Sequence, residues 1–362
     1  MNGEMLWINI EGNTSMQLNA MRDHPSLGFI DWTLRGIGQV VFQNNPLSGL
    51  VILFAILVNS WIYALVCLLG VVSSTLTAII LKADKGLIRD GLFGFNGVLV
   101  ALALVAFTSE DFRSGAVPSP AMTIYVICAA ALTTMAFTSI AALLGPHKVA
   151  PLTMPFVLVG WLFLFAILKF DAIDAGPMAK PVSPEQFSYA IPYDLPTWYM
   201  GIGTAIGQIF FQDNWITGYI MLVGIAIHSR ISAFMGLLGA IIGAVIAATF
   251  GGPEGAIRDG LFGYNAALTA MALGGFFLVF NWSSFLYAVF GAVVSTWVWA
   301  SVAIFLKPIG MPVLTSTFVI VTWIMLIGQY AFKALVPVAP ADATTAEENL
   351  KRYRQTLRSR PE

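Results

Sequence analysis

Charged residues are scarce in this chain of 362 residues. Asp, Glu, Lys and Arg make up 10% of the sequence, whereas soluble globular proteins carry roughly 25%. With 58% apolar residues and a mean hydropathy of +0.81, the composition excludes a soluble enzyme and indicates an integral membrane protein. The 18 basic and 19 acidic residues nearly cancel, so no single-sign field is available to bind nucleic acid.

Residues that carry chemistry are also few. The two cysteines, Cys67 and Cys128, lie in apolar stretches and form neither a disulfide framework nor a metal-ligand spacing. His24, His147 and His228 fall in loops or in the N-terminal segment, and the apolar runs contain no Ser-His-Asp set, metal cluster or paired carboxylates. We therefore predict that the protein is not an enzyme and uses no cofactor or metal. Ion or proton coupling is disfavoured, because coupled carriers keep ionisable side chains inside the membrane.

Long runs without charge place the membrane-spanning segments. A helix needs roughly 20 residues to cross about 30 Å of hydrocarbon, and several charge-free runs are long enough for one or two crossings. We predict an all-α integral membrane protein with ten transmembrane helices. The first five lie near 46–60, 62–81, 91–108, 121–144 and 151–170. The second five lie near 216–228, 231–250, 260–280, 284–306 and 312–333.

The chain repeats itself. Residues 36–45 (GIGQVVFQNN) match residues 205–214 (AIGQIFFQDN), and residues 88–96 (IRDGLFGFN) match residues 257–265 (IRDGLFGYN), both at an offset of 169. A third match, around Thr153 and Thr315, has an offset of 162. Because each half contains an odd number of crossings, the halves enter the membrane in opposite orientations. Inverted repeats of this kind place a transport site between the halves, near the bilayer midplane.

Two segments are too short to span the membrane. Residues 33–45 and 202–214 precede the first full helix of each half and end in polar residues. Lipid cannot satisfy the hydrogen bonds of backbone that stops at membrane depth, so such segments must line a cavity or be buried in protein. We predict that both are re-entrant half-helices beside a central pore.

The predicted organisation has five parts: an N-terminal cytoplasmic segment (1–30), a first inverted repeat (31–170), an external linker (171–198), a second inverted repeat (199–334) and a cytoplasmic C-terminal tail (335–362). Most Lys and Arg residues then fall on one side of the membrane, which predicts cytoplasmic termini. The charged part of the tail, residues 341–362, is expected to be solvated. No secretory signal is visible, and the expected location is the cell (inner) membrane.

The repeated segments combine uncharged polar side chains with aromatic rings. The pairs are Gln39 with Phe42, Gln208 with Phe211, Phe95 with Asn96 and Tyr264 with Asn265, together with Thr153 and Thr315. A slot of this composition suits a small neutral solute that donates several N–H hydrogen bonds. Ordinary helix packing is the alternative for single aromatics such as Phe156 and Phe318. Arg89-Asp90 and Arg258-Asp259 are expected to form local ion pairs that cap the loop before a helix.

Several motifs resemble the urea transporter family. They are LRGIGQVVF at 34–42, NNPLSG at 44–49, STLTA at 74–78, GFNGVLV at 94–100, GYN at 263–265 and PVLT at 312–315. The resemblance extends from about residue 30 to residue 333. It implies a homotrimer in membrane lipid, in which each protomer has its own passive pore formed by the two half-helices and the fifth helix of each repeat.

The resemblance also implies which side chains meet urea. Gln39 and Gln208 end a ladder of oxygen acceptors, and Thr153 and Thr315 supply hydroxyls at the narrow centre. The walls are formed by Phe42, Leu261, Phe95, Tyr264, Leu99, Leu268 and Ile209. Two features depart from the family pattern: Pro151 is one residue closer to Thr153 than Pro312 is to Thr315, and Thr317 replaces the proline found at Pro155.

The predicted function is passive movement of urea down its gradient. The alternative is a channel of the same fold for another small neutral solute, such as ammonia, a short-chain amide or water. A coupled carrier is the more distant alternative, since it would require a buried carboxylate or a dedicated cation site.

Overall fold

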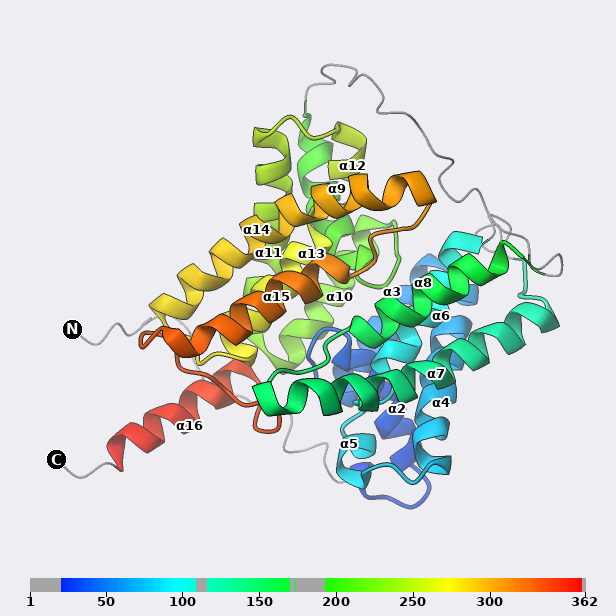
Figure 1. Cartoon of the computed structure of the whole chain (residues 1–362), viewed down its shortest axis with the longest axis horizontal. Helices are drawn as coiled ribbons and strands as arrows, with labels where there is room; N and C mark the ends of the chain where they lie inside the picture. The colour runs from blue at the N-terminus through cyan, green and yellow to red at the C-terminus, as the bar shows by residue number, and fades with distance from the viewer. Residues whose placement is uncertain (1–20, 109–115, 170–172, 174–192, 360–362) are drawn as a thin grey trace.

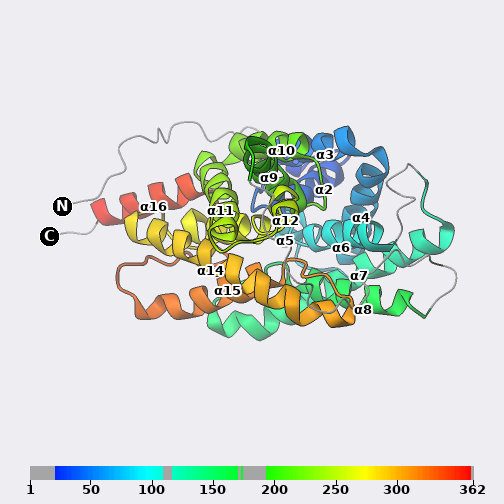
Figure 2. The same cartoon turned by 90° about the horizontal axis from the view of Figure 1, so that it is seen from above.

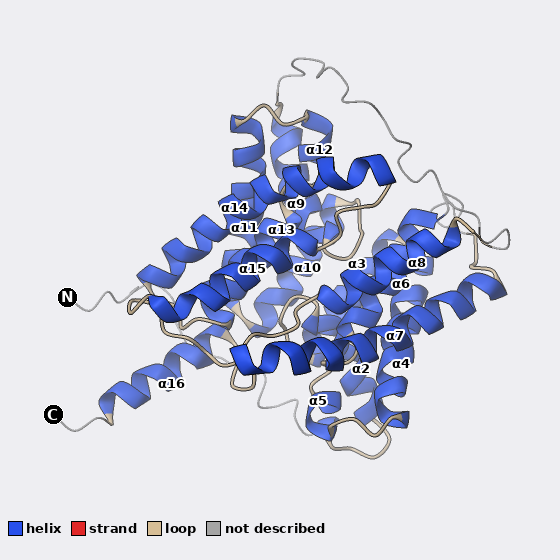
Figure 3. Cartoon of the chain, viewed as in Figure 1, coloured by secondary structure: helices blue, strands red, loops and turns tan. Residues whose placement is uncertain are grey.

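The computed structural model describes residues 21–108, 116–169, 173 and 193–359. Within these residues the chain is helical, with one isolated antiparallel bridge between Leu278 and Pro337 and no strand (Figure 3). The prediction of an all-α protein is therefore confirmed. Most of the N-terminal segment 1–30 and of the linker 171–198 lies outside the described residues.

The two halves contain the same series of helices. The first half consists of α2 (Gly28–Gln39), α3 (Pro46–Asn59), α4 (Trp61–Ile80), α5 (Lys85–Arg89), α6 (Phe95–Thr108), α7 (Pro120–Leu144), η1 (Gly145–His147) and α8 (Met154–Ile167). The second half consists of α9 (Leu195–Gln208), α10 (Trp215–His228), α11 (Arg230–Thr249), α12 (Glu254–Arg258), α13 (Tyr264–Met271), η2 (Ala272–Phe276), α14 (Trp282–Leu306), η3 (Lys307–Ile309) and α15 (Ser316–Gly328). The chain ends with η4 (Gln329–Ala331) and α16 (Ala346–Arg358).

Each of the ten predicted ranges contains a helix. Four of them, built on α4, α7, α11 and α14, are long and apolar enough to cross a membrane. α3, α6, α8, α10 and α15 are apolar but shorter. The predicted span 260–280 is interrupted, because Gly274 and Gly275 have non-helical backbone angles and Gly275 has φ +139°.

The helices are arranged in layers. Figure 2 shows α7, α8, α14 and α15 together on one side of the molecule, with α2, α3, α9 and α10 on the opposite side. α4, α6 and α11 lie between them, and α13 packs against α11 and α14. α6 and α13 contribute the most completely buried residues of the core. In Figure 1, α8 and α15 lie between α7 and α14, so the ends of the two halves meet near the centre.

The two halves contact each other reciprocally. The Trp161 indole N–H donates to the carbonyl of Pro312 at 2.9 Å, and the Trp323 indole N–H donates to the carbonyl of Ala150 at 3.0 Å. Donors and acceptors both correspond at the offset of 162 found in the sequence. The same contact is therefore made in both directions across the interface between the halves.

Each short helix packs tightly against the helix that follows it. A Cβ atom added to Gly49 of α3 would lie 1.8 Å from the carbonyl oxygen of Leu34 in α2. A Cβ atom added to Gly218 of α10 would lie 1.8 Å from the carbonyl oxygen of Gly203 in α9. Glycine is required at both positions because the backbones are in contact. α2 with α3, and α9 with α10, thus form two matching helical hairpins.

The C-terminal tail packs against the second half. The Val279 N–H donates to the carbonyl of Val336, and the Val338 N–H donates to the carbonyl of Phe277, both at 2.9 Å. Thr345 and Asn349 are buried further along the tail. The expectation of a solvated tail is therefore wrong for this part, because its polar groups find partners in the fold. The outer face of α16 remains exposed.

The expected local ion pair at Arg89-Asp90 is also wrong. Asp90 pairs with Arg22 at 2.6 Å, and Arg89 pairs with Asp23 at 2.8 Å. Adjacent residues on a short helix point in different directions, so each reaches the N-terminal segment instead of its neighbour. In the second half, Arg258 pairs with Glu254 at 2.8 Å and with Asp194 at 3.0 Å.

Candidate functional site

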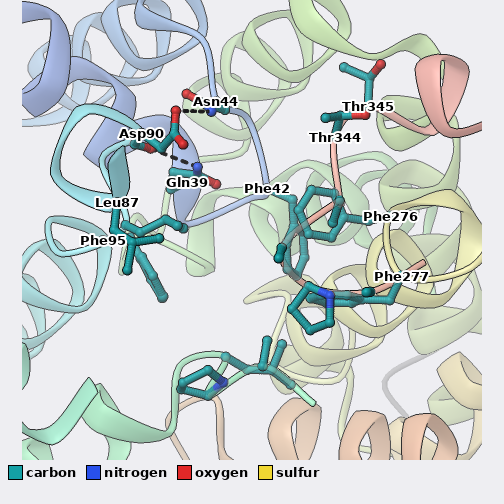
Figure 4. A pocket seen from close by; sticks show the side chains of 18 of the residues that line it. Gln39, Phe42, Asn44, Leu87, Asp90, Phe95, Phe276, Phe277, Thr344 and Thr345 are labelled. Atoms are coloured by element: carbon teal, nitrogen blue, oxygen red, sulfur yellow. Dashed lines mark hydrogen bonds between the residues drawn. The ribbon is translucent and has the colours of Figure 1, made fainter. Parts of the chain in front are cut away.

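A cavity of about 970 Å³ opens beside the C-terminal tail and reaches Thr153 at the N-terminal end of α8. Its walls come from both halves of the chain (Figure 4). Gln39, Asp90 and Phe95 line one side, and Phe42, Phe276 and Phe277 line the other. Four of the eleven predicted pore residues line this cavity: Gln39, Phe42, Phe95 and Thr153.

Gln39 ends α2 and is held in one orientation. Its Nε2 donates to the backbone carbonyl of Asp90 at 2.9 Å, which leaves Oε1 as the group facing the cavity (Figure 4). Asn44 Nδ2 donates to Asp90 Oδ1 at 3.0 Å, and Arg22 pairs with the same carboxylate. The last carbonyls of a helix lack partners within that helix and carry the negative end of its dipole. The carbonyls of Gly38 and Gln39 accept N–H groups of the turn that follows α2, so the side-chain oxygen of Gln39 is the acceptor that this helix end presents to the cavity.

The turn after each short helix has the same construction. Phe42 and Phe211 both adopt left-handed backbone angles, with φ of 64° and 59°. The side chains of Asn45 and Asn214 then accept hydrogen bonds from the first N–H groups of α3 and α10. Left-handed φ is uncommon for a bulky residue, and it is maintained here by matching turns in both halves.

These turns place one aromatic ring from each half against the other half. The Phe42 ring centroid lies 4.8 Å from that of Phe276 and 6.1 Å from that of Phe318. The Phe211 ring centroid lies 5.8 Å from that of Phe107 and 6.0 Å from that of Phe156. The partners correspond at the same offsets as the repeat. Two equivalent aromatic clusters therefore lie at the interface between the halves.

A pair of threonine hydroxyls lies between α8 and α15. Thr153 Oγ1 and Thr315 Oγ1 are 2.5 Å apart, and both residues are buried. Their backbone conformations agree closely, with φ of −95° and −94°, in spite of the different position of the preceding proline. Leu152 and Leu314 also match, with φ of 54° and 52°. The shift of proline between the halves thus leaves the two threonines equivalent.

Two buried asparagines leave these hydroxyls available. A threonine at a helix N-cap ordinarily uses its side-chain oxygen to accept an N–H from the first turn. Here Asn96 Oδ1 accepts the Phe156 N–H at 3.0 Å, and Asn265 Oδ1 accepts the Phe318 N–H at 3.0 Å. Neither threonine makes a side-chain capping bond to its own helix. Asparagines from α6 and α13 therefore replace the threonines as helix caps.

The second half carries one further polar contact. The Tyr264 hydroxyl donates to the carbonyl of Leu314 at 2.5 Å and accepts from the Trp299 indole N–H at 3.3 Å. Phe95 occupies the equivalent place in the first half and lies edge-on to Phe137 at 5.9 Å. Tyr264 thus orients the carbonyl that precedes Thr315, whereas Phe95 offers an apolar face to the cavity.

The other predicted pore residues have varied surroundings. Leu99 and Leu268 are fully buried one turn beyond Phe95 and Tyr264, and Ile209 is buried at the end of α9. Gln208, which ends α9, and Leu261, which precedes α13, are half-buried. The roles of these five side chains in transport remain predictions.

Some residues of the site were not predicted. Phe211, equivalent to Phe42 at the offset of 169, was paired with Gln208 in the sequence but was not among the eleven predicted pore residues. Phe107 and Phe276 are also related by that offset, but they lie outside the conspicuous motifs. The capping roles of Asn96 and Asn265 depend on partners 60 and 53 residues away and could not be inferred locally.

The arrangement favours a neutral donor of N–H hydrogen bonds. The Gln39 oxygen and the threonine hydroxyls are acceptors and aromatic rings form much of the wall, while charged side chains such as Lys148, Glu348 and Arg352 also line the cavity. Arg35 also lines the cavity, and Asp31 neutralises its charge at 2.6 Å. No group of three or more potential metal ligands gathers anywhere in the described part of the chain.

Comparisons with known proteins identify the family. A model of the urea transporter family matches residues 30–330. The chain is 28% identical over 348 residues to urea transporter 1 of the rat (Rattus norvegicus), covering 96% of this chain and 89% of that protein. It is 28% identical over 358 residues to urea transporter 1 of the sheep (Ovis aries), covering 96% of this chain and 90% of that protein.

Proposed function

The chain belongs to the urea transporter family and is a membrane transporter of urea, and we propose that it works as a passive channel. The observation that carries the proposal is the pair of hydroxyls, Thr153 and Thr315, at the interface between the halves. A cavity leads from one mouth, where charged side chains such as Lys148 and Arg352 lie, to Thr153, and Gln39 and aromatic rings are part of its lining. A neutral solute can pass such a centre without a change of charge in the protein.

Urea matches this lining in shape and in hydrogen bonding. Its NH₂ groups can donate to the side-chain oxygen of Gln39, while the threonine hydroxyls can donate to its carbonyl or accept from its nitrogens. Its flat faces fit between rings such as those of Phe42 and Phe95. Gln208, Ile209, Leu261, Tyr264, Leu99 and Leu268 would form the corresponding walls in the other half.

The reciprocal contacts support an inverted repeat. When two like units are related by a two-fold rotation, each contact occurs twice with its partners exchanged. The two tryptophan–carbonyl bonds and the two aromatic clusters have this property. We therefore propose ten transmembrane helices and two re-entrant half-helices, arranged as two oppositely oriented repeats around the pore.

The assembly and orientation are part of the same proposal. We propose a homotrimer in the cell (inner) membrane with both termini in the cytoplasm. The basic-residue distribution supports the orientation, and the structure brings Leu87, Lys148, His228 and the tail to the same mouth of the cavity. Exposed apolar side chains on α3, α4 and α14 supply surface for lipid or for neighbouring protomers.

Stopped-flow light scattering on proteoliposomes tests the channel. Gradients of urea, acetamide, glycerol and water are compared with and without a membrane potential. Fast urea flux that is independent of potential and pH is expected. Slow urea flux with fast amide, ammonia or water flux would keep the fold and reject urea as the solute, and flux that depends on potential or on a cation would reject the passive mechanism.

Replacing Gln39 tests the site. Gln39→Ala removes one acceptor, and a neutral hydrogen bond of about 1 kcal/mol corresponds to about fivefold lower urea flux. Gln355→Ala, on the exposed face of α16, is the matched control and should leave the flux unchanged. Unchanged flux in folded Gln39→Ala protein would remove Gln39 from the site.

A further inference from the structure

The C-terminal tail forms part of the mouth of the cavity. We name residues 336–352 the strap. It runs antiparallel to residues 277–279 through two backbone hydrogen bonds and then enters α16. Thr344 and Thr345 of the strap line the cavity on the same side as Phe42, Phe276 and Phe277 (Figure 4).

One strap residue holds the backbone that carries Phe276. Asn349 Nδ2 donates to the carbonyls of Gly275 and Phe276 at 2.9 and 3.0 Å. Asn349 Oδ1 accepts from the Thr344 N–H at 3.2 Å and from the Thr344 hydroxyl at 2.8 Å. These bonds from Thr344 fix which way the amide faces. Asn349 is buried, and its side-chain NH₂ group and its side-chain oxygen both have hydrogen-bond partners.

A second anchor fixes the start of α16. Glu347 accepts from the Ser229 hydroxyl at 2.7 Å and from the Ile231 N–H at 2.9 Å, so its carboxylate lies at the N-terminal end of α11. A Cβ atom added to Gly275 would lie 2.4 Å from the Cβ atom of Ala346. The strap therefore rests directly on the interruption that follows α13.

Among the described residues of the first half, the positions equivalent to this interruption lie in regular helix. Phe107 is equivalent to Phe276, but it lies inside the continuous helix α6, where Val105 and Ala106 stand in place of Gly274 and Gly275. Phe276 follows a glycine with φ +139°, so its backbone carbonyl takes its partner from outside the helix.

We propose that the strap sets the width of the urea slot at this mouth, with Asn349 as a positioning residue for Phe276. Phe276 lies 4.8 Å from Phe42 between ring centroids, so a shift of its backbone changes the opening beside Phe42. A slot of fixed width admits urea and excludes its N-methylated analogues. The inference rests on the proposed channel function and adds a specificity determinant outside the repeated core.

The test uses the full-length protein in proteoliposomes, with urea and N,N′-dimethylurea as probes. Asn349→Asp removes both donated hydrogen bonds and keeps the acceptor for Thr344. Loss of one neutral hydrogen bond of about 1 kcal/mol changes an equilibrium constant by about fivefold. We therefore expect the ratio of dimethylurea to urea permeability to rise at least about fivefold. Gln355→Glu is the matched control, because it makes the same chemical change on the exposed face of α16 and should leave the ratio unchanged.

Hydrogen exchange supplies a second readout that does not depend on the solute. In Asn349→Asp, the amides of Phe277 and Val279 should exchange faster, while those of residues 103–107 in α6 keep their wild-type rates. Unchanged exchange overturns the inference, and so does faster exchange with an unchanged permeability ratio. If Asn349→Asp does not fold, Thr344→Val is used instead, because it removes the hydroxyl that orients Asn349. The ratio of dimethylurea to urea permeability should then rise by a smaller factor, and no rise overturns the inference. If the wild-type protein shows no urea flux, the proposed channel function is wrong. The hydrogen-exchange experiment does not depend on urea flux, so it tests the role of the strap separately.

Discussion

Replacing Asn265 by leucine should destabilise the protein and slow urea flux together. The change preserves approximate side-chain size but removes the acceptor of the buried Phe318 N–H. A buried donor without a partner costs about 1–3 kcal/mol in the free energy of unfolding. We expect the Thr315 hydroxyl to turn toward its own helix, where a threonine cap recovers about 1 kcal/mol. That hydroxyl would then leave Thr153, and urea flux would fall.

A double-mutant cycle with Thr315→Val separates these effects. The free energy of unfolding is measured by denaturation in mixed micelles, and urea flux is measured in proteoliposomes. If the hydroxyl takes over the cap, the double variant should lose more free energy than the sum of the single variants, by the worth of the new cap minus that of the Thr153–Thr315 bond, which both single variants lose. Thr269→Val, which removes only a hydroxyl bond to the carbonyl of Asn265 in the same helix, is the control and should leave urea flux unchanged. Additive free energies with unchanged flux in Asn265→Leu would refute the reasoning.

Two further predictions concern the Thr153–Thr315 pair and the N-terminal end of α9. Thr153→Val should lower urea flux by about fivefold, because it removes one hydroxyl of the central pair, whereas Thr153→Ser should remain near wild type in the same assay. The pKa of Asp194 is lowered from its usual 3.8, first by the Thr197 hydroxyl and backbone N–H and then by Arg258. The ionised Asp194 carboxylate should therefore stabilise the protein above about pH 4, and this stabilisation should disappear as the pH falls through the lowered pKa. In Asp194→Asn, the thermal stability should fall less steeply with pH on the acid side than in the wild type. An unchanged slope on the acid side would mean that this cap does not contribute to acid sensitivity.

Local pattern was sufficient for much of the architecture. A helix begins or ends within a few residues of most predicted boundaries, because charge-free apolar runs and turn residues are local properties of the sequence. The predicted span 260–280 failed at Gly274 and Gly275, where paired glycines permit angles that the rest of the helix does not adopt. The resemblance to urea transporters, inferred from short motifs, was confirmed by a family match over residues 30–330.

The sequence by itself determined that this is a helical membrane protein built from two related halves, and it singled out Gln39, Phe42 and the two threonines. Composition and the repeat are sufficient for these inferences, because each can be recognised without knowing which segments meet in space. Only the tertiary structure decided that Asn96 and Asn265 cap the helices of Thr153 and Thr315, that Asp90 pairs with Arg22, and that the tail holds Phe276. Buried polar groups must find partners wherever the fold brings them, and those partners lie tens of residues away along the chain.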